Sequence, residues 1–393
     1  MRFYNRQHHH YCGIDLHVKT MYICTLDSAG QVLVHRNVKS TPEAFLEIVT
    51  PYREDLVVAA ECMFTWYWLA DVCAAEGIAF VLGHALAMKA IHGGKAKNDK
   101  IDSHKIASLL RGGLLPQAYV YPAGMRSTRD LIRRRLHLVR KRGELLAHIQ
   151  NTRAQYNLPA VERRLAYPAN RDGVSAHFAD PSVRKSIDVD VALIDQYDTL
   201  IVDLEFTIVR EAKRHDADAF HRLRSVPGIG KVLALTILYE MHDVTRFDRV
   251  QECASDARLV KCVHQSAGKK LGTGGAKMGN VHLKWAFSEA AVLFLRHTKD
   301  GKKILAGIRR STAKGRPCRS SPTRLGAQCF TCSRERPSSR WRSSARRSEE
   351  GSGRARRLTR AIGTELVTDR DPACAVERHE PTIMSHRSGS ELA

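Results

Sequence analysis

The sequence predicts an α/β protein, with a mixed β-sheet and packed helices near the N-terminus and a mostly helical second half. Two patterns predict this class. Short apolar runs alternate with amphipathic segments up to residue 113, and helical periodicity dominates beyond it. The chain of 393 residues is long enough for two or three domains. We expect a sheet domain at residues 10–113, a helical spacer at 114–217, a helical domain at 218–308 and a basic tail at 309–393.

The expected sheet domain begins with a β-meander. Strand-forming residues predict strands at 11–18, 21–26 and 31–38, and Asp27-Ser-Ala-Gly30 forms the second turn. Thr41 is placed to cap the helix that follows. The remaining elements are a strand at 56–61, a helix at 65–76, a strand at 78–82, and helices from 85 and over 99–110. This order of elements is typical of the RNase H-like fold.

Four acidic residues of this domain have unusual surroundings. Asp15 lies inside an apolar run, Glu61 closes another, and Asp99 and Asp102 are three positions apart on an expected helix. A carboxylate that ends a buried strand is unfavourable unless it is paired or binds a metal. In an RNase H-like sheet the first and fourth strands are adjacent, and residues i and i+3 share a helix face. We therefore expect the four to converge and to bind Mg²⁺ or Mn²⁺ through oxygen. Solvated surface acids are the alternative for Asp99 and Asp102 taken alone.

Two long amphipathic segments follow the sheet domain. Residues 126–157 carry an apolar stripe between many Arg and Lys side chains, and residues 190–217 carry a second stripe. Together they predict a helical hairpin or coiled coil that serves as a spacer or as a dimerisation arm. Two helices packed within one domain are the alternative.

The composition points to a nucleic-acid partner. The net charge is +22, which favours binding to a polyanion. No uninterrupted apolar stretch approaches the roughly 20 residues that a membrane span needs, so no membrane partner is expected. Ten cysteines without framework spacing fit reduced thiols in a cytosol.

Two motifs in the helical domain suggest contacts with phosphate groups. Val226-Pro-Gly-Ile-Gly-Lys231 resembles a helix-hairpin-helix turn, which presents backbone N–H groups to a nucleic-acid backbone; a plain interhelical turn is the alternative. The Gly- and Lys-rich segment 264–280 predicts an anion-binding loop, with a flexible basic loop as the alternative. The nucleic-acid-binding residues expected from both motifs are Gly228, Gly230, Lys231, Lys269, Lys270 and Lys277.

Five segments in combination resemble the DEDD transposases of bacterial insertion sequences, over residues 10–308. The segments are Gly13-Ile-Asp15-Leu-His17, Ala60-Glu61, Lys97-Asn-Asp-Lys-Ile-Asp102, Val226-Pro-Gly-Ile-Gly230 and Ser266-Ala-Gly-Lys269. The resemblance implies a RuvC-like domain that a coiled coil joins to a C-terminal transposase domain. It also implies a recombinase of DNA that is guided by a structured bridge RNA.

The resemblance assigns roles to particular residues. Asp15, Glu61, Asp99 and Asp102 would form a Mg²⁺-binding tetrad, and a serine of the C-terminal domain would attack the DNA. Ser266 is the serine we choose because it opens the Ser-x-Gly-Lys segment, and Ser288 and Thr273 are its competitors. The expected partners are element and target DNA, a guide RNA and further copies of the chain, as a dimer or tetramer. The expected location is the bacterial cytoplasm, in association with the nucleoid.

Two other functions stay open at this point. A metal-dependent DNA nuclease or junction resolvase would use activated water, and would need the tetrad but not Ser266. A catalytically inactive nucleic-acid-binding remnant would need neither.

The tail at residues 309–393 departs from the resemblance, which implies an amphipathic helix there. The tail has 18 arginines and one lysine, Lys314, a bias that GC-rich DNA read out of frame would give. The codons of residues 312–323, read one base earlier, allow a Lys-rich turn followed by an apolar run. We therefore hypothesise that the reading frame changes near residues 305–312. A genuine disordered basic tail is the alternative, and its single Cys329-Phe-Thr-Cys332 pair is weak evidence for zinc.

Overall fold

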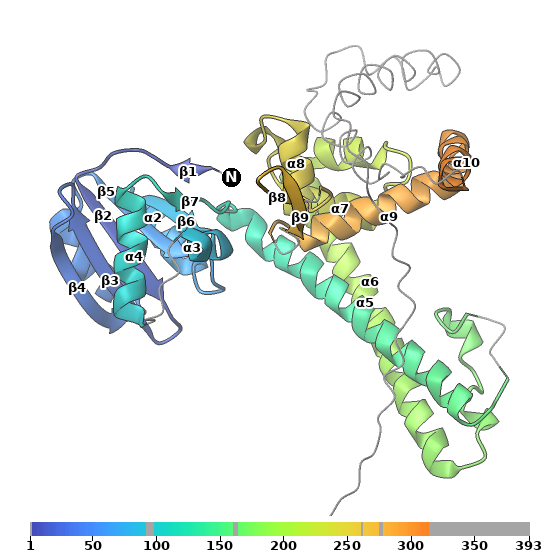
Figure 1. Cartoon of the computed structure of the whole chain (residues 1–393). Coiled ribbons are helices and arrows are strands. Elements are labelled where there is room, and N and C mark those ends of the chain that lie inside the picture. Colours follow the sequence, from blue (N-terminus) through green and yellow to red (C-terminus); the bar gives the residue numbers. More distant parts are fainter. Residues whose placement is uncertain (1, 92–97, 160–163, 261, 275–277, 314–393) are drawn as a thin grey trace, which may run out of the picture. The chain divides into compact units, whose positions relative to one another are not determined.

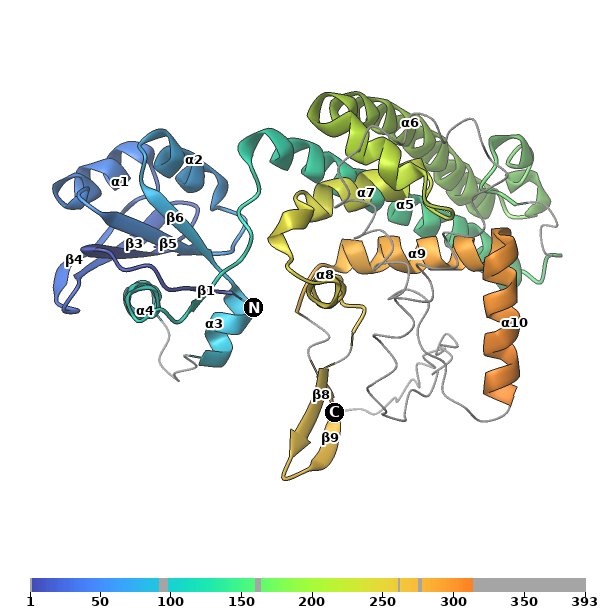
Figure 2. The same ribbon diagram turned by 90° about the horizontal axis from the view of Figure 1, so that it is seen from above.

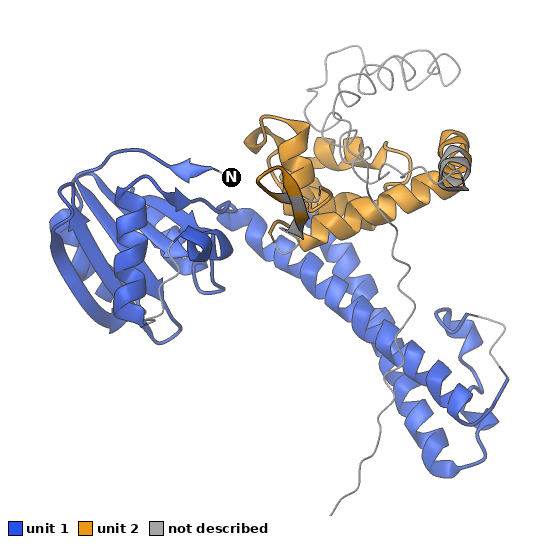
Figure 3. Cartoon of the chain, viewed as in Figure 1, with its two compact units in different colours: residues 1–211 blue, residues 212–393 orange. Residues whose placement is uncertain are grey.

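The computed structural model describes residues 2–91, 98–159, 164–260, 262–274 and 278–313. The chain divides into two compact units, Met1–Glu211 and Ala212–Ala393 (Figure 3). The first unit holds the expected sheet domain and a pair of long helices. The described part of the second unit holds shorter helices and a β-hairpin.

A five-stranded mixed sheet with the order β4-β3-β2-β5-β6 forms the centre of the first unit. Strands β2 (His10–Leu16), β3 (Thr20–Asp27) and β4 (Val32–Lys39) form an antiparallel meander. Strands β5 (Leu56–Glu61) and β6 (Ala79–Gly83) run parallel to β2. Parallel strands need crossover connections, and helices supply them. The predicted mixed α/β class with an RNase H-like sheet is confirmed.

Helices cover both faces of this sheet (Figure 2). Helices α1 (Pro42–Val49) and α2 (Tyr67–Ala75) bury Phe45 and Leu69 against one face. Helix α4 (Asp99–Arg111) buries Ile106 and Leu110 against the other face, and α3 (Ala85–Ile91) contributes Met88 there. As expected, Thr41 caps α1, because its hydroxyl accepts a hydrogen bond from the Ala44 amide at 3.3 Å. A short pair of strands, β1 (Phe3–Tyr4) and β7 (Leu115–Pro116), lies outside the sheet.

Two long helices follow the sheet, α5 (Ala123–Gln155) and α6 (Pro181–Arg224) (Figure 1). The first unit includes α5 and the part of α6 up to Glu211, and the rest of α6 belongs to the second unit. Within this unit they pack antiparallel, as the ion pairs between them show. Arg135 pairs with Glu205 at 2.8 Å, Arg142 with Asp198, and His148 with Asp190. Regular helical geometry is interrupted at Asp216 of α6, where φ is −160° and ψ is 85°. The two segments that the sequence predicted to be helical therefore form a helical hairpin.

The second unit contains helices α7 (Lys231–Met241), α8 (Val250–Asp256), α9 (Val281–His297) and α10 (Lys299–Ala313). Helix α7 packs along α9. Glu240 of α7 is fully buried, and the side-chain amide of Asn280 donates a hydrogen bond to it at 2.7 Å. The Asn280 oxygen also caps α9, since it accepts from the amides of His282 and Leu283.

Two features of the second unit differ from the sequence-based expectation. Residues 264–274, part of the segment 264–280 that was expected as a loop, belong to a β-hairpin of β8 (Cys262–Ser266) and β9 (Lys269–Gly274). Helix α10 (Lys299–Ala313) continues into the first residues of the tail that was expected at 309–393. Lys277 and the tail from residue 314 lie outside the described residues. Among the described helices, none combines the length and the apolar character that crossing a membrane requires.

Candidate active site

Asp15 and Glu61 lie at the ends of neighbouring strands. The parallel register pairs Ile14 of β2 with Ala60 of β5, so Asp15 and Glu61 follow directly on adjacent strands. Side chains alternate along a strand. Tyr11 belongs to the core cluster on the α4 side, together with alternate residues of β5, which places both carboxylates on the sheet face that α4 covers.

Helix α4 brings its first turn to the same place. Asn98 caps the helix, accepting a hydrogen bond from the Ile101 amide at 2.7 Å. The cap sets the start of the helix so that Asp99 and Asp102 both fall in its first turn. Asp99 is exposed, whereas Asp102 is half-buried and pairs with Lys105 at 3.3 Å.

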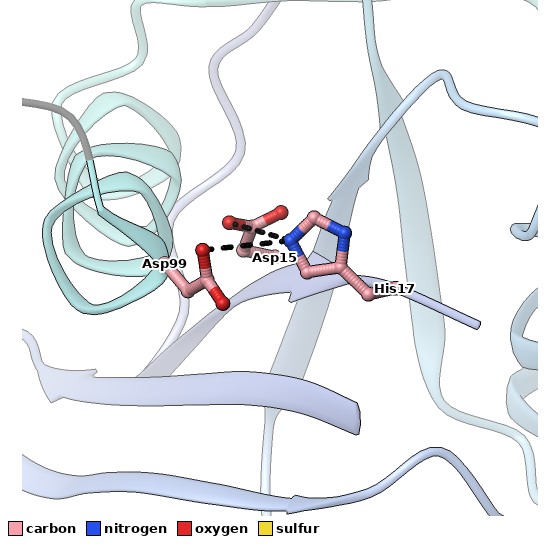
Figure 4. Close-up of side chains that lie close together, drawn as sticks. All are labelled: Asp15, His17 and Asp99. Carbon is pink, nitrogen blue, oxygen red and sulfur yellow. Dashed lines mark ion pairs between the residues drawn. The ribbon is translucent and has the colours of Figure 1, made fainter. Parts of the chain in front are cut away.

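His17 joins two of these carboxylates. Its Nε2 lies 3.5 Å from Asp15 Oδ2 and 3.6 Å from Asp99 Oδ1 (Figure 4). Among the described residues, Asp15, His17 and Asp99 form a set whose ligand atoms all lie within 4.8 Å of one another. Glu61 and Asp102 are not in this closest set. The structure thus brings Asp15 and Asp99 to one point, as the sequence predicted, and adds a histidine to which no role was assigned.

Burial and neighbouring charges both act on the Asp15 carboxyl group. Burial raises the pKa of its carboxyl group, His17 lowers this pKa, and the charges of Asp99 and Asp102 raise it further. The net result is a pKa above the ordinary value, because the repulsion and the burial outweigh the pairing with His17. A divalent cation bound here would relieve both effects.

Basic side chains of α5 stand close to the Glu61 end of the site. Burial raises the pKa of the Cys62 thiol, and the guanidinium groups of Arg129 and Arg133 act against that rise, while Glu61 adds to it. Arg129 also lies over the ring of Tyr121, 3.8 Å from its centroid. Positive charge therefore lies beside Cys62 and Glu61.

The Val226–Lys231 turn has two glycines with different surroundings. Gly228 has a φ of +93°, and a Cβ there would lie 2.6 Å from the carbonyl oxygen of Ala290 and 2.9 Å from the amide of Phe294. Its lack of a side chain thus serves close packing against α9. Gly230, at the start of α7, has open space around it, and the next residue, Lys231, is exposed.

Ser266 stands at the tip of the β8–β9 hairpin. It pairs in register with Lys269 across a two-residue turn of Ala267 and Gly268. Both turn residues have positive φ, 47° and 75°, as the tightest hairpin turns require. Ser266 and Lys269 are exposed, and the competitor Ser288 lies half-buried on α9. The backbones of Lys270 and Thr273 belong to β9.

An RNase H-like sheet with Asp15 near a strand end and Asp99 on a neighbouring helix agrees with the class of protein that the sequence comparisons show, the DEDD transposases. Residues 12–157 match the DEDD transposase model of the IS110 type, and residues 220–306 match the model described as the transposase IS116/IS110/IS902 family. The chain belongs to this IS110 family of DEDD transposases, enzymes that use a divalent metal and act on DNA.

A curated relative supports the same assignment. The chain is 23% identical, over 291 residues, to the transposase for insertion sequence element IS1111A of Coxiella burnetii (strain RSA 493 / Nine Mile phase I). The similarity covers 73% of this chain and 78% of that protein.

Proposed function

We propose that this transposase cleaves and rejoins DNA with a serine nucleophile, supported by Mg²⁺ or Mn²⁺ at an acidic tetrad and guided by a structured RNA. The proposal that the acidic residues bind a divalent cation rests on the convergence of Asp15 and Asp99. They lie far apart in the sequence, yet both carboxylates reach one imidazole within 3.6 Å. In the proposal, Glu61 at the end of β5 and Asp102 on α4 complete the tetrad.

The donor set fits a hard divalent cation. Carboxylate oxygens are the ligands that Mg²⁺ and Mn²⁺ prefer. A cation held by Asp15 and Asp99 supplies electrostatic stabilisation of the charge that develops on a phosphodiester. The chain's own contribution is to keep these carboxylates fixed on a strand and a capped helix, and to hold Arg129 and Arg133 nearby.

Ser266 supplies the nucleophile in this proposal. Its Oγ forms a bond to the DNA phosphorus as the bond to one deoxyribose oxygen breaks, and the serine proton passes to solvent while the departing oxygen takes up a proton. The phosphoserine ester conserves the bond energy, so that rejoining needs no high-energy cofactor. The hairpin tip supports this role because an exposed side chain on a tight turn can reach a DNA backbone, and Lys269 across the turn offers a phosphate contact.

The proposed contacts with nucleic acid and with further copies of the chain rest on the chain's positive charge and on its family. We propose that Gly230, Lys231, Lys269, Lys270 and Lys277 contact nucleic-acid backbones, and that Gly228 supports the first of these contacts through its packing on α9. We further propose that the RNase H-like domain and the helical hairpin hold guide RNA, and that dimers or tetramers act at the nucleoid in the bacterial cytoplasm. Such contacts make binding strongly dependent on salt.

A covalent-adduct assay tests the nucleophile. Full-length protein is incubated with Mg²⁺, the element's RNA and end-labelled DNA of the element ends, then denatured and resolved by electrophoresis. We expect a DNA-linked protein band that Ser266→Ala abolishes and Ser288→Ala retains. Asp15→Asn should abolish cleavage altogether. Cleavage without any adduct in both the wild type and Ser266→Ala would instead establish a nuclease that uses activated water, and the absence of any Asp15-dependent processing would establish a binding remnant.

A further inference from the structure

His17 contacts Asp15 and Asp99 but is not a member of the proposed tetrad. It follows strand β2 two positions after Asp15, and residues i and i+2 of an extended chain point to the same side. Figure 4 shows its ring directed at the gap between Asp15 and Asp99, with one nitrogen facing both carboxylates. The side chain is 52% exposed, so packing does not fix the ring in this direction.

The distances from His17 Nε2 to the Asp15 and Asp99 carboxylates fit three ligands of one shared ion better than they fit a direct hydrogen bond. A charge-assisted N–H···O bond measures about 2.7–2.9 Å, whereas His17 stands 3.5 Å and 3.6 Å from the two carboxylate oxygens. Ligand atoms that are about 2.1 Å from a common octahedral ion lie about 3–4 Å from one another. The three ligand atoms, all within 4.8 Å of each other, match this spacing closely enough for small side-chain rotations to complete it.

We propose that His17 is a ligand of the ion held by Asp15 and Asp99, and that its nitrogen makes this site prefer Mn²⁺ to Mg²⁺. The inference rests on the proposed metal site. Imidazole binds first-row transition ions readily, while Mg²⁺ strongly prefers oxygen. A site with one imidazole nitrogen and two carboxylates should therefore bind Mn²⁺ with little loss of affinity and should bind Mg²⁺ less tightly.

Electron paramagnetic resonance of full-length protein with Mn²⁺ tests this ligand directly, without any measurement of activity. Pulsed measurements detect the ¹⁴N coupling of a coordinated imidazole, and titration of the free-ion signal gives the affinity. We expect ¹⁴N coupling in the wild type and its loss in His17→Ala. Mn²⁺ affinity should fall about tenfold or more, as the loss of well-placed groups at metal sites typically causes. Mg²⁺ affinity, measured by competition, should change less than about twofold, so the preference for Mn²⁺ should shrink.

Two further variants separate the possible outcomes. His104→Ala removes an exposed histidine of α4 outside the ligand set and should leave coupling and affinity intact. Asp15→Asn should remove the bound Mn²⁺ together with its ¹⁴N signal. If Mn²⁺ binding depends on Asp15 but shows no ¹⁴N coupling, and His17→Ala keeps full affinity, then His17 is not a ligand while the carboxylate site stands. If Asp15→Asn leaves Mn²⁺ binding unchanged, the proposed metal site itself is wrong.

Discussion

Gly13 of β2 lies in backbone contact with Ala107 of α4. A Cβ placed on Gly13 would be 2.3 Å from the Ala107 amide nitrogen and 2.4 Å from the carbonyl oxygen of Ser103. Helix α4 can therefore lie closer to β2 than any other residue type would allow. Because Asp15 follows two residues after Gly13 and Asp99 begins α4, this contact sets how near the two carboxylates can come.

The first prediction concerns this contact. Gly13→Ala should destabilise the first unit by at least about 1–3 kcal/mol, since the new methyl group meets backbone atoms that cannot rotate away. Chemical denaturation monitored by circular dichroism measures the loss. Gly143→Ala is the matched control, because that glycine is within α5 and a Cβ attached to it would meet nothing within 4 Å. It should be neutral or stabilising by up to about 1 kcal/mol. Equal stability of the two variants would contradict the packing argument.

Asp15 allows a prediction about pH and metal. Its pKa is raised above the ordinary value of 3.8, so the stability linked to this group is full at low pH and is lost as pH rises through the folded-state pKa. At neutral pH, Asp15→Asn should therefore raise the melting temperature of the metal-free protein, by about 2–4 °C for each 1 kcal/mol of repulsion removed. The difference should vanish below the ordinary pKa, where the wild-type carboxyl is protonated.

Asp15→Asn and the wild type should also differ in how their melting temperatures respond to added metal. Adding Mn²⁺ should raise the melting temperature of the wild type, because ligands stabilise the state that binds them, and should leave Asp15→Asn nearly unchanged. Differential scanning calorimetry across pH, with chelator or with metal, checks both effects. A wild type that is more stable than Asp15→Asn in chelator at neutral pH would show that attraction to His17 outweighs burial and repulsion.

Arg126 carries a prediction about the junction of α2 and α5. It is buried, donates to the Tyr121 carbonyl at 2.6 Å and to the Asp71 carboxylate at 2.9 Å, and lies 4.6 Å from the centroid of the Trp66 ring. Arg126→Met should cost about 3 kcal/mol, since it leaves buried partners unsatisfied. Arg134→Met, at an exposed position of the same helix, should stay within about 0.5 kcal/mol of the wild type. Urea denaturation of the two variants decides whether Arg126 holds this junction.

The mixed sheet was predictable from the sequence, whereas the signal for the candidate site differed from residue to residue. Asp15 gave a local signal as a charge within an apolar strand, whereas Asp99 and Asp102 gave only their spacing of three positions on an expected helix. His17 gave no such signal, since a polar residue after a strand is ordinary. The proposed role of His17 as a metal ligand depends on Asp99 of α4, and only the tertiary fold brings that helix close to His17.

The hairpin at Ser266 was missed for a different physical reason. Its turn residues, Ala267 and Gly268, both adopt positive φ, and alanine rarely does so. Glycines and lysines, which are typical of loops, make up much of the segment, and Val263 and Thr273 are its two β-branched residues. The strand pairing here is set by the turn, and composition alone does not reveal it.

The last prediction concerns the reading frame of the tail. The family match ends at residue 306, close to where the arginine-rich tail begins. The codons of Cys329-Phe-Thr-Cys332, read one base earlier, can encode only Met or Val, then Phe or Leu, then Tyr or His, then Leu, Met or Val. Synonymous codon choice does not change this apolar and aromatic pattern, which is the kind that a buried helix needs.

We therefore expect the nucleotide sequence, read one base earlier from about residue 312 onward, to continue without stop codons as an amphipathic helix that extends the family match. A chain expressed from the corrected frame should be more stable than the present chain, because the new helix would bury apolar surface. Denaturation of both chains measures this difference. Early stop codons in the shifted frame would instead establish residues 309–393 as a genuine basic tail, and its deletion should then weaken nucleic-acid binding in a salt-dependent way.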